Sequence, residues 1–347
     1  MNFKSKIVTL SLGHGLNDLI AGYFLGSFAA ENNNLLQIGL AITIYNVLAF
    51  GGQYPVAILI EKINDIKKII VFSYLLNVIA IAIFLFLPAF AILLAGIASA
   101  IYHVAGGSYC AANNKATNIG LFAAPGIAGL IAGGFLSWNG FNIIPFLLPI
   151  AIAFLIILTR INFIKQFSEK NNTTNNKQTT IIDQHDIIMI LLLIIISLRS
   201  VIWNVLQLIN ENNFEWLIAI AIAAVVGKIA GGWLADKIGW RLYAILSTLI
   251  ATPLLTFFKK EMVIFCIGVG LLQSGIPATT SLLIHSLKGK TARGIALSFG
   301  TAIVIGAAAS IFPSQLVLQQ IPYLLLASIL ILFVCFYWYK RIANRPV

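Results

Sequence analysis

The sequence predicts an all-α membrane protein with twelve transmembrane helices in two pseudo-symmetric bundles of six. Three observations support this fold class. Of the 347 residues, 60% are hydrophobic and 10% are charged, whereas a soluble domain has about 25% charged residues. The hydrophobic residues form twelve stretches close to the length of about 20 residues that a helix needs to cross hydrocarbon. One long polar stretch divides these into six and six.

Six apolar stretches make up the first half of the chain, at residues 6–30, 34–60, 68–88, 89–111, 117–138 and 142–160. The first of them follows Lys4 and Lys6, an arrangement that also occurs in secretory signals. This stretch contains His14, Asn17 and Asp18 and lacks a clear cleavage site of small residues. We therefore expect it to be kept as the first helix.

The second half contains six further apolar stretches, at residues 187–208, 215–236, 240–258, 260–286, 291–313 and 321–341. Helices are expected throughout because hydrocarbon gives backbone amides no partner and the stretches lack the alternation of barrel strands. Cys110, Cys266 and Cys335 fall inside predicted spans at no metal-ligand spacing. We expect no metal site and no cofactor.

The formal charge of +11 follows the positive-inside rule. When the N-terminus is placed in the cytoplasm, only Lys259 and Lys260 fall in outside loops, and Arg199 and Lys228 lie within spans. The charge is therefore an orientation signal and not a nucleic-acid footprint, and it places both termini in the cytoplasm. Abundant Asn, Ile and Lys suggest a bacterial source, so the expected location is the bacterial plasma membrane.

The polar stretch at residues 161–186 is rich in Asn and Thr and predicts a cytoplasmic linker. It separates a six-helix bundle at 1–160 from a second bundle at 187–347. The division of the chain into two domains rests on this linker.

An internal repeat supports the same division. Glu61, after the second span, corresponds to Asp236, after the eighth, at an offset of 175 residues. Lys115 corresponds to Lys290 at the same offset. Parallel repeats of six helices are a known layout of membrane transporters.

Polar residues inside the spans concentrate on the first, fourth, seventh and tenth helices. Each is a candidate site residue because a polar group in hydrocarbon is costly. Spacings of three and four place them on shared helix faces. We expect these faces to line a central substrate cavity formed by Asn17, Tyr102, His103, Arg199, Trp203, Asn204, Gln207, Gln273, Pro277 and Thr280.

His14 and Asp18 share one face of the first span, and His103 lies in the fourth. A carboxylate and an imidazole in a water-accessible cavity can pass a proton between the two membrane faces, because imidazole titrates near physiological pH. These three residues are therefore candidates for a proton relay. The alternative is structural, with His14, Asp18 and Asn17 as a hydrogen-bonded group and His103 as a packing residue.

Arg199 needs a partner because a guanidinium stays protonated inside a membrane. Asp18 is one candidate, a carbonyl dipole is a second, and an anionic group on a substrate is a third. Lys228 lies nearer the cytoplasmic end of its span. We expect its ammonium to extend to the lipid headgroups.

Two glycine-containing segments predict structural roles. Gly232-x-x-x-Asp236-x-x-Gly239-x-Arg241 places a carboxylate where it can bond the N-terminal amides of a neighbouring helix and pair with Arg241. Together with Glu61 of the first half, this segment would make a conformational latch. The fifth span carries a small-residue face with a proline kink, formed by Gly120, Pro125, Gly129 and Gly133.

With these motifs the chain resembles the major facilitator superfamily over essentially its whole length. The segment from Gly232 to Arg241 is similar to the signature loop of that superfamily. The first-half loop departs from the pattern, since Glu61 stands at the acid position while Ala57 and Asn64 replace glycines. The fifth span is similar to the proline-glycine motif associated with antiporters.

A narrower resemblance is to the fosmidomycin-resistance branch of the superfamily and its bacterial relatives. It rests on Ser11 to Asp18, on Gln53-Tyr54-Pro55 and on Ala100 to His103. In that branch proline and an acid follow the histidine, whereas this chain has Val104 and Ala105. The substrate of the branch is therefore not carried over.

The resemblance implies a central cavity between the halves and alternating access by rocking of one half against the other. We expect a monomeric secondary transporter that binds a small-molecule substrate, protons and membrane lipid but no nucleic acid, with proton-coupled export by antiport favoured. Uptake or facilitated diffusion of a small anionic metabolite is the first alternative, and a non-transporting receptor or assembly protein is the second. An enzyme is not expected, because the sequence shows no nucleophile-base-acid set or phosphate loop.

Overall fold

The computed structural model describes residues 2–63, 65–163, 184–208, 213–308 and 314–343. Over these residues the chain is helical and contains no strand. Most of the predicted linker at 161–186 lies outside the described residues.

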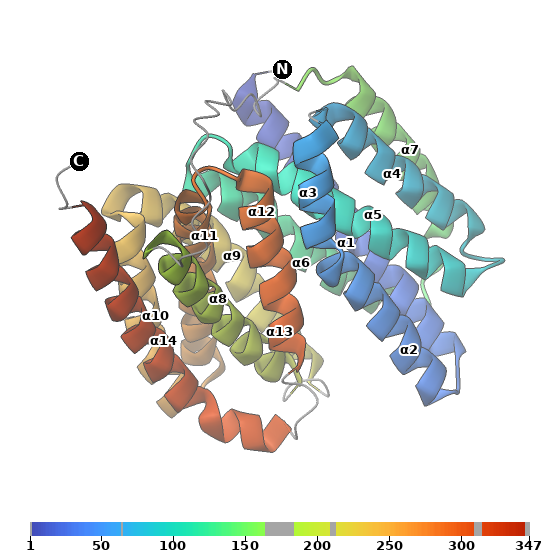
Figure 1. Cartoon of the computed structure of the whole chain (residues 1–347). Coiled ribbons are helices and arrows are strands. Elements are labelled where there is room, and N and C mark those ends of the chain that lie inside the picture. The colour runs from blue at the N-terminus through green and yellow to red at the C-terminus, as the bar shows by residue number, and fades with distance from the viewer. Residues whose placement is uncertain (1, 64, 164–183, 209–212, 309–313, 344–347) are drawn as a thin grey trace.

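The first half of the chain contains seven α-helices, which run from blue to green in Figure 1. The π-helical turn η1 joins α2 to α3, so these three elements form one continuous stretch. The elements are α1 (Phe3–Glu31), α2 (Leu35–Asn46), η1 (Val47–Gly51), α3 (Gln53–Ile63), α4 (Ile66–Ile83), α5 (Pro88–Ala111), α6 (Ala116–Trp138) and α7 (Ile144–Arg160).

The second half runs from green to red in Figure 1, and a second π-helical turn, η2, joins α12 to α13. The elements are α8 (Gln184–Leu208), α9 (Phe214–Ile238), α10 (Trp240–Phe257), α11 (Met262–Ser286), α12 (Thr291–Ala296), η2 (Leu297–Thr301), α13 (Ala302–Ala308) and α14 (Ser314–Ala343).

These elements form twelve helical stretches that correspond to the twelve predicted spans, so the predicted fold class is confirmed. Within the described residues, nine of the stretches are long and apolar enough to cross a membrane. Ile144–Arg160 and Thr291–Ala307 are shorter apolar helices, and α1 is 29 residues long. The start of the last span was predicted at residue 321, whereas α14 begins at Ser314 and continues through Pro322.

Asparagine and aspartate side chains cap several helices where the predicted loops begin. The Asn34 side chain accepts hydrogen bonds from the amides of Leu36 and Gln37, and the Asp65 carboxylate accepts one from the Lys68 amide. These bonds satisfy amides that have no partner within the helix. Gly239 separates α9 from α10 with a φ of +99°, a conformation that favours glycine.

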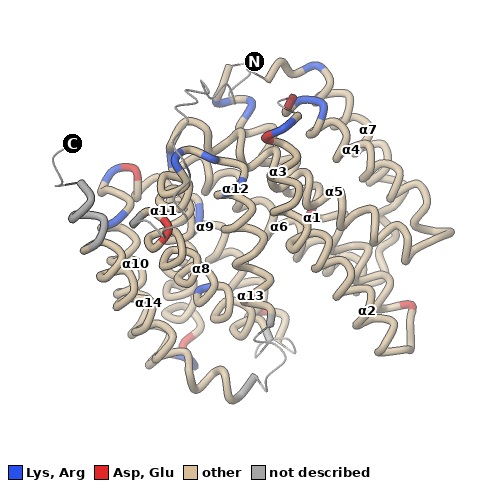
Figure 2. The backbone as a smooth tube through the Cα atoms, viewed as in Figure 1, with Lys and Arg blue, Asp and Glu red and all other residues tan. Residues whose placement is uncertain are grey.

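Lysine and arginine residues gather at one end of the helical bundle, uppermost in Figure 2, which we call the basic end. Lys62 and Lys237 lie in the last turns of α3 and α9, and Lys115 and Lys290 precede α6 and α12. The two halves share a hydrophobic core here. Ile119 and Phe122 of the first half belong to one buried cluster with residues of the second half, namely Ile284, Ala292, Ile295, Ala296 and Phe299.

The two π-helical turns, η1 and η2, also meet between the halves. The Gln53 side-chain amide donates to the Ala49 carbonyl at 2.9 Å and to the Phe299 carbonyl of η2 at 3.3 Å. Gly300 lies against this contact, where an added Cβ would lie 2.8 Å from the Gln53 Cβ. Because π-helical turns are rare and recur at functional sites, this crossing joins the halves at an unusual stretch of backbone.

The closest packing in the first half is between α1 and α6. Gly129 and Gly133 face the backbone of α1, and a Cβ at either position would overlap the carbonyl of Gly15 or Leu19. Small residues let helix backbones approach within a membrane, as expected for this segment. Gly120 instead faces the second half, and α6 continues without interruption through Pro125.

This packing predicts that Gly129→Ala lowers the stability of the protein. The added methyl group would force α1 and α6 apart, and overpacking of this kind costs about 1–3 kcal/mol. The melting temperature of the detergent-solubilised protein measures the effect. Gly134→Ala is the matched control because its nearest neighbour would be the Gly22 carbonyl at 3.9 Å. Equal melting temperatures for the two variants would contradict the packing account.

Candidate functional site

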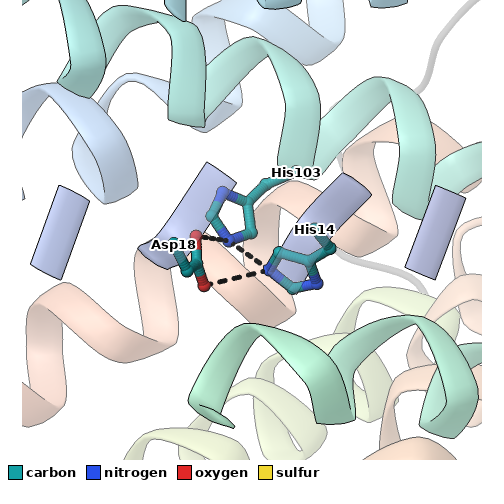
Figure 3. A group of neighbouring side chains, drawn as sticks. All are labelled: His14, Asp18 and His103. Carbon is teal, nitrogen blue, oxygen red and sulfur yellow. Dashed lines mark hydrogen bonds and ion pairs between the residues drawn. The ribbon is translucent and has the colours of Figure 1, made fainter. Parts of the chain in front are cut away.

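The structure brings His14 and Asp18 of α1 together with His103 of α5 inside the first half (Figure 3). His14 Nε2 lies 3.2 Å from Asp18 Oδ2, and His103 Nε2 lies 3.6 Å from Asp18 Oδ1. The two Nε2 atoms are 2.7 Å apart. All three side chains are largely buried, with the Asp18 side chain 13% exposed. We call this group the His–Asp cluster.

Local geometry explains how the His–Asp cluster assembles. The spacing of four residues places His14 and Asp18 on one face of α1, as the sequence predicted. Gly126 of α6 covers the pair. A Cβ at that position would lie 2.6 Å from both Asp18 Oδ2 and His14 Nε2, so only glycine lets α6 close over the cluster.

The hydrogen bonds on the far side of each ring fix where the protons are. His14 Nδ1 lies 2.7 Å from the Phe122 carbonyl oxygen, and His103 Nδ1 lies 2.7 Å from the Ser99 carbonyl oxygen. A carbonyl oxygen only accepts, so both Nδ1 atoms carry a hydrogen. In two neutral rings both Nε2 atoms would then be bare acceptors, which cannot bond each other. The 2.7 Å contact therefore requires one additional proton shared between His14 and His103.

The same three side chains are close enough to be considered for a metal ion, since one ligand atom from each lies within 4.8 Å of the others. Two imidazole nitrogens at about 2.0–2.1 Å from one tetrahedral metal would be separated by about 3.3 Å. The observed separation of 2.7 Å is shorter and matches a hydrogen bond. This geometry favours a shared proton.

A layer of neutral polar side chains holds the His–Asp cluster in place. The Asn17 side-chain amide donates to Asp18 Oδ1 at 2.9 Å and to Ser99 Oγ at 3.2 Å, while its oxygen accepts from Asn77 at 2.9 Å. The Tyr45 hydroxyl also donates to Ser99 Oγ. Sequence reasoning missed Asn77 and Tyr45. Asn77 is a polar residue inside the predicted third span, which is the feature that identified the other candidate site residues.

Arg199 lies apart from the His–Asp cluster. It is completely buried, and its guanidinium donates to the Ala244 carbonyl and the hydroxyls of Thr248 and Thr279, on α10 and α11. Its Nε has no hydrogen-bond partner among the described residues. Of the three candidate partners, the carbonyl dipole is the one observed, and Asp18 bonds His14, His103 and Asn17 instead.

The other predicted cavity residues are divided between the two halves. Tyr102 is buried in the first half and donates to the Leu10 carbonyl at 2.9 Å. Thr280 is hydrogen-bonded to Ser298 of η2. Of the remaining residues, Trp203, Asn204 and Gln207 of α8 are partly buried, and Gln273 and Pro277 of α11 are buried.

Lys228 corrects an expectation drawn from the sequence. Its ammonium was expected to extend to the lipid headgroups, but it interacts electrostatically with Asp18 and His103 of the opposite half. The distance of a residue from the end of a span does not reveal which face of the helix it occupies. Lys228 is half-buried, and it lies on the face of α9 that meets α6, since its carbonyl packs against Gly120.

Asp236 joins the two halves at the basic end. Its carboxylate accepts hydrogen bonds from the backbone amides of Ala116 and Thr117, both at 2.9 Å, and from the Thr117 hydroxyl at 2.6 Å. These are the first residues of α6, where a negative charge is favoured by the helix dipole. Gly232 lets the helices approach, since a Cβ there would lie 2.9 Å from the Thr117 Cα. The expected pairing of Asp236 with Arg241 stays a prediction.

Glu61 makes the corresponding contact from the first half. Its Oε2 lies 2.8 Å from Nη2 and 2.9 Å from Nε of Arg293, on α12. The first-half loop lacks the glycines of the signature pattern, yet its acid still reaches the second half. Arg293 was not predicted as a partner because two loops far apart in sequence gave no sign of proximity.

These contacts predict that Asp236→Asn favours separation of the two halves at the basic end. The substitution weakens charge-assisted bonds, which are about twice as strong as neutral ones. Spin labels at Lys68 and Lys290, one in each half, should report longer distances by double electron–electron resonance. Asp65→Asn is the control because Asp65 caps a helix within its own half. An unchanged distance distribution in Asp236→Asn would contradict the latch.

Twelve helical stretches among the described residues, most of them apolar, form two groups that are joined at one end, and this is the architecture of a multi-pass membrane protein. The model of the Major Facilitator Superfamily matches residues 7–313, and the chain belongs to this family. The resemblance seen in the sequence motifs is therefore confirmed at the level of the superfamily. A comparison of the sequence with curated proteins finds no match.

Solved transporters share the fold. The chain is similar to the E. coli fucose:proton symporter FucP, with a TM-score of 0.70, 14% identity and full coverage of both chains. It is similar to FucP in the outward conformation, with a TM-score of 0.74, 14% identity and 99% coverage of each chain. A bacterial homologue of the iron transporter ferroportin in an outward-facing state gives a TM-score of 0.62 and 12% identity, with coverage of 98% of this chain and 100% of the other.

Proposed function

We propose that the chain is a secondary transporter that moves a small solute across a bacterial plasma membrane by alternating access, coupled to protons. The observation that carries this proposal is the contact between His14 and His103, which requires a shared proton beside Asp18. A buried group that must hold one proton is the element that proton coupling needs.

The charge of the His–Asp cluster depends on that proton. With the proton in place, one positive charge is shared by the two rings and balances Asp18. Loss of the proton leaves a net negative charge, which is costly in a closed and water-poor bundle. The two halves can therefore enclose the protonated cluster, whereas the deprotonated cluster needs access to water or to a cation.

The orientation and state of the molecule follow from the charge distribution. The positive-inside rule assigns the basic end and both termini to the cytoplasm. Because Asp236 and Glu61 join the halves at that end, we propose that this arrangement is outward-facing. We further propose that the protein acts as a monomer and belongs to the fosmidomycin-resistance branch.

The direction of transport has two candidate answers. Export by antiport is the first candidate, because the fifth span is similar to the antiporter motif, in which Ala124 and Ala128 replace glycines, and uptake is the alternative. Accumulation of solute in inverted membrane vesicles under a pH gradient would support export. Accumulation in intact cells would support uptake.

Asp18→Asn should lower proton-coupled flux by about tenfold or more while the protein still folds. The neutral amide cannot balance the charge of the shared proton. Loss of a hydrogen bond to a charged group costs about 1.5–3 kcal/mol, which corresponds to a fall in proton-coupled flux of about tenfold or more. The measurement is solute-driven proton movement into proteoliposomes that contain a pH-sensitive dye, with a mixture of metabolites outside. Asp65→Asn, at an exposed loop, should behave as wild type. Undiminished coupled flux in Asp18→Asn would reject the relay.

A receptor or assembly protein with the same fold is the second candidate function. It is favoured if deletion of residues 166–182 abolishes the cellular phenotype while Asp18→Asn and Arg199→Lys are tolerated. The opposite pattern supports transport, because the buried ionisable groups would then be the essential ones.

A further inference from the structure

Lys228 is a charged residue well inside a membrane span that faces the opposite half. One turn towards the basic end, Gly232 packs against the start of α6, and the Lys228 carbonyl packs against Gly120 of α6. Six residues further along α6, Gly126 covers Asp18 and His14. Lys228 and the His–Asp cluster therefore lie along the same helix of the first half, separated by less than two of its turns.

The direction of the lysine side chain brings it closer to the cluster. Side chains in an α-helix lean towards the N-terminus of the helix, and in α9 this direction leads away from the basic end. Lys228 precedes Asp236 by eight residues, which is about 12 Å along the helix axis. The ammonium therefore points to the interior of the membrane, in agreement with its electrostatic interaction with Asp18 and His103.

The positive charge of Lys228 has no partner of its own among the described residues. Among the residues that the structure describes, no carboxylate lies within 4.0 Å of its ammonium. Asp18, the acid with which it interacts electrostatically, already bonds both histidines and Asn17. Since the protonated cluster is neutral, the site as a whole carries one unbalanced positive charge. Arg199 is not part of this site, because it lies apart from the His–Asp cluster and its guanidinium is bound by groups of α10 and α11.

An apolar cavity, open at the surface of the bundle, lies between α6 and the helix that carries Lys228. Its volume is about 320 Å³, and it is formed between α6 and α9 by residues that include Ala128, Ile131, Ala221 and Val225. Val225 precedes Lys228 by three residues, so the cavity begins one helical turn away on the side towards which the lysine leans. This volume lies at the lower end of the range for small-molecule pockets, about 300–1,000 Å³.

We propose that Lys228 binds the anionic group of the transported solute, a small monoanion whose apolar part occupies the cavity between α6 and α9. This assignment rests on the proposed transport function and specifies its substrate class. One unbalanced ammonium matches one negative charge, and the apolar walls match a hydrocarbon body. The solute would contact both halves, since Lys228 belongs to the second and α6 to the first.

The assignment links solute binding to the proton. When the His–Asp cluster holds its proton, Asp18 is balanced and Lys228 is available to the anion. When the proton leaves, Asp18 competes for the ammonium and the anion binds less tightly. Proton and anion should therefore bind together, the type of linkage that a symporter uses, so this inference favours the uptake alternative over export by antiport. The titratable groups that interact with Asp18 are His14, His103, Tyr45, Tyr74, Tyr102 and Lys228.

The test is a transport screen with solutes that differ only in charge. Proteoliposomes under a pH gradient of either sign are given a defined mixture of carboxylates, sulfonates and phosphonates together with the corresponding neutral amides and esters, and the retained solutes are identified by mass spectrometry. Wild-type protein should retain a monoanion in preference to its neutral counterpart. Lys228→Gln should reduce this retention by about tenfold or more, whereas Lys228→Arg and the exposed control Lys259→Gln should preserve it.

Each outcome separates the substrate assignment from the transport function. Retention of a neutral or cationic solute, or of a monoanion that Lys228→Gln transports as well as wild type, would overturn the role of Lys228 and leave transport intact. Failure of the wild-type protein to retain any member of the mixture at either gradient would count against transport itself, and the assignment would fall with it. Size-exclusion profiles that match wild type exclude misfolding as the cause of a loss in Lys228→Gln.

Discussion

Two imidazole nitrogens face each other at 2.7 Å inside the first half, and the surrounding structure keeps them there. Each ring is held from behind by a backbone carbonyl, so neither can turn away without leaving a buried donor unbonded, which costs about 1–3 kcal/mol. Asn17 fixes Asp18 from the side, and Gly126 lets α6 cover the group. The arrangement is stable only with a proton between the rings, which makes proton occupancy the variable that sets the charge of the site.

Helix α6 connects this site to the rest of the molecule. Its first residues are held by Asp236 of the second half, and its second turn provides the carbonyl of Phe122 that positions His14. Gly120, on the same helix, lies against Lys228. A movement of α6 relative to α9 would therefore alter the contact at the basic end and the distance between Lys228 and the His–Asp cluster together. Because α6 is one continuous helix, rocking of the halves would change the electrostatics of the site.

The fold class could be predicted from the sequence because the length of each apolar stretch and the charge of each loop are properties of local segments. It also identified His14 and Asp18 as neighbours, since residues four apart share a helix face. Contacts between segments far apart in the chain were harder to predict from the sequence. The bond between His14 and Phe122, the role of Asn77 and the ion pair of Glu61 with Arg293 all depend on how helices are rotated and packed. Lys228 was misassigned for the same reason, because hydropathy gives depth in the membrane but not the direction of a side chain.

The account depends on one proton shared by two histidines, and nitrogen-15 NMR of the histidine side chains measures this directly. With His185 and His285 replaced, only the two rings of the cluster remain. The account predicts that both rings carry hydrogen on Nδ1, that the pair holds one additional proton at Nε2, and that the two rings titrate together. Two independent neutral rings, with hydrogen on Nε2 in either of them, would contradict it.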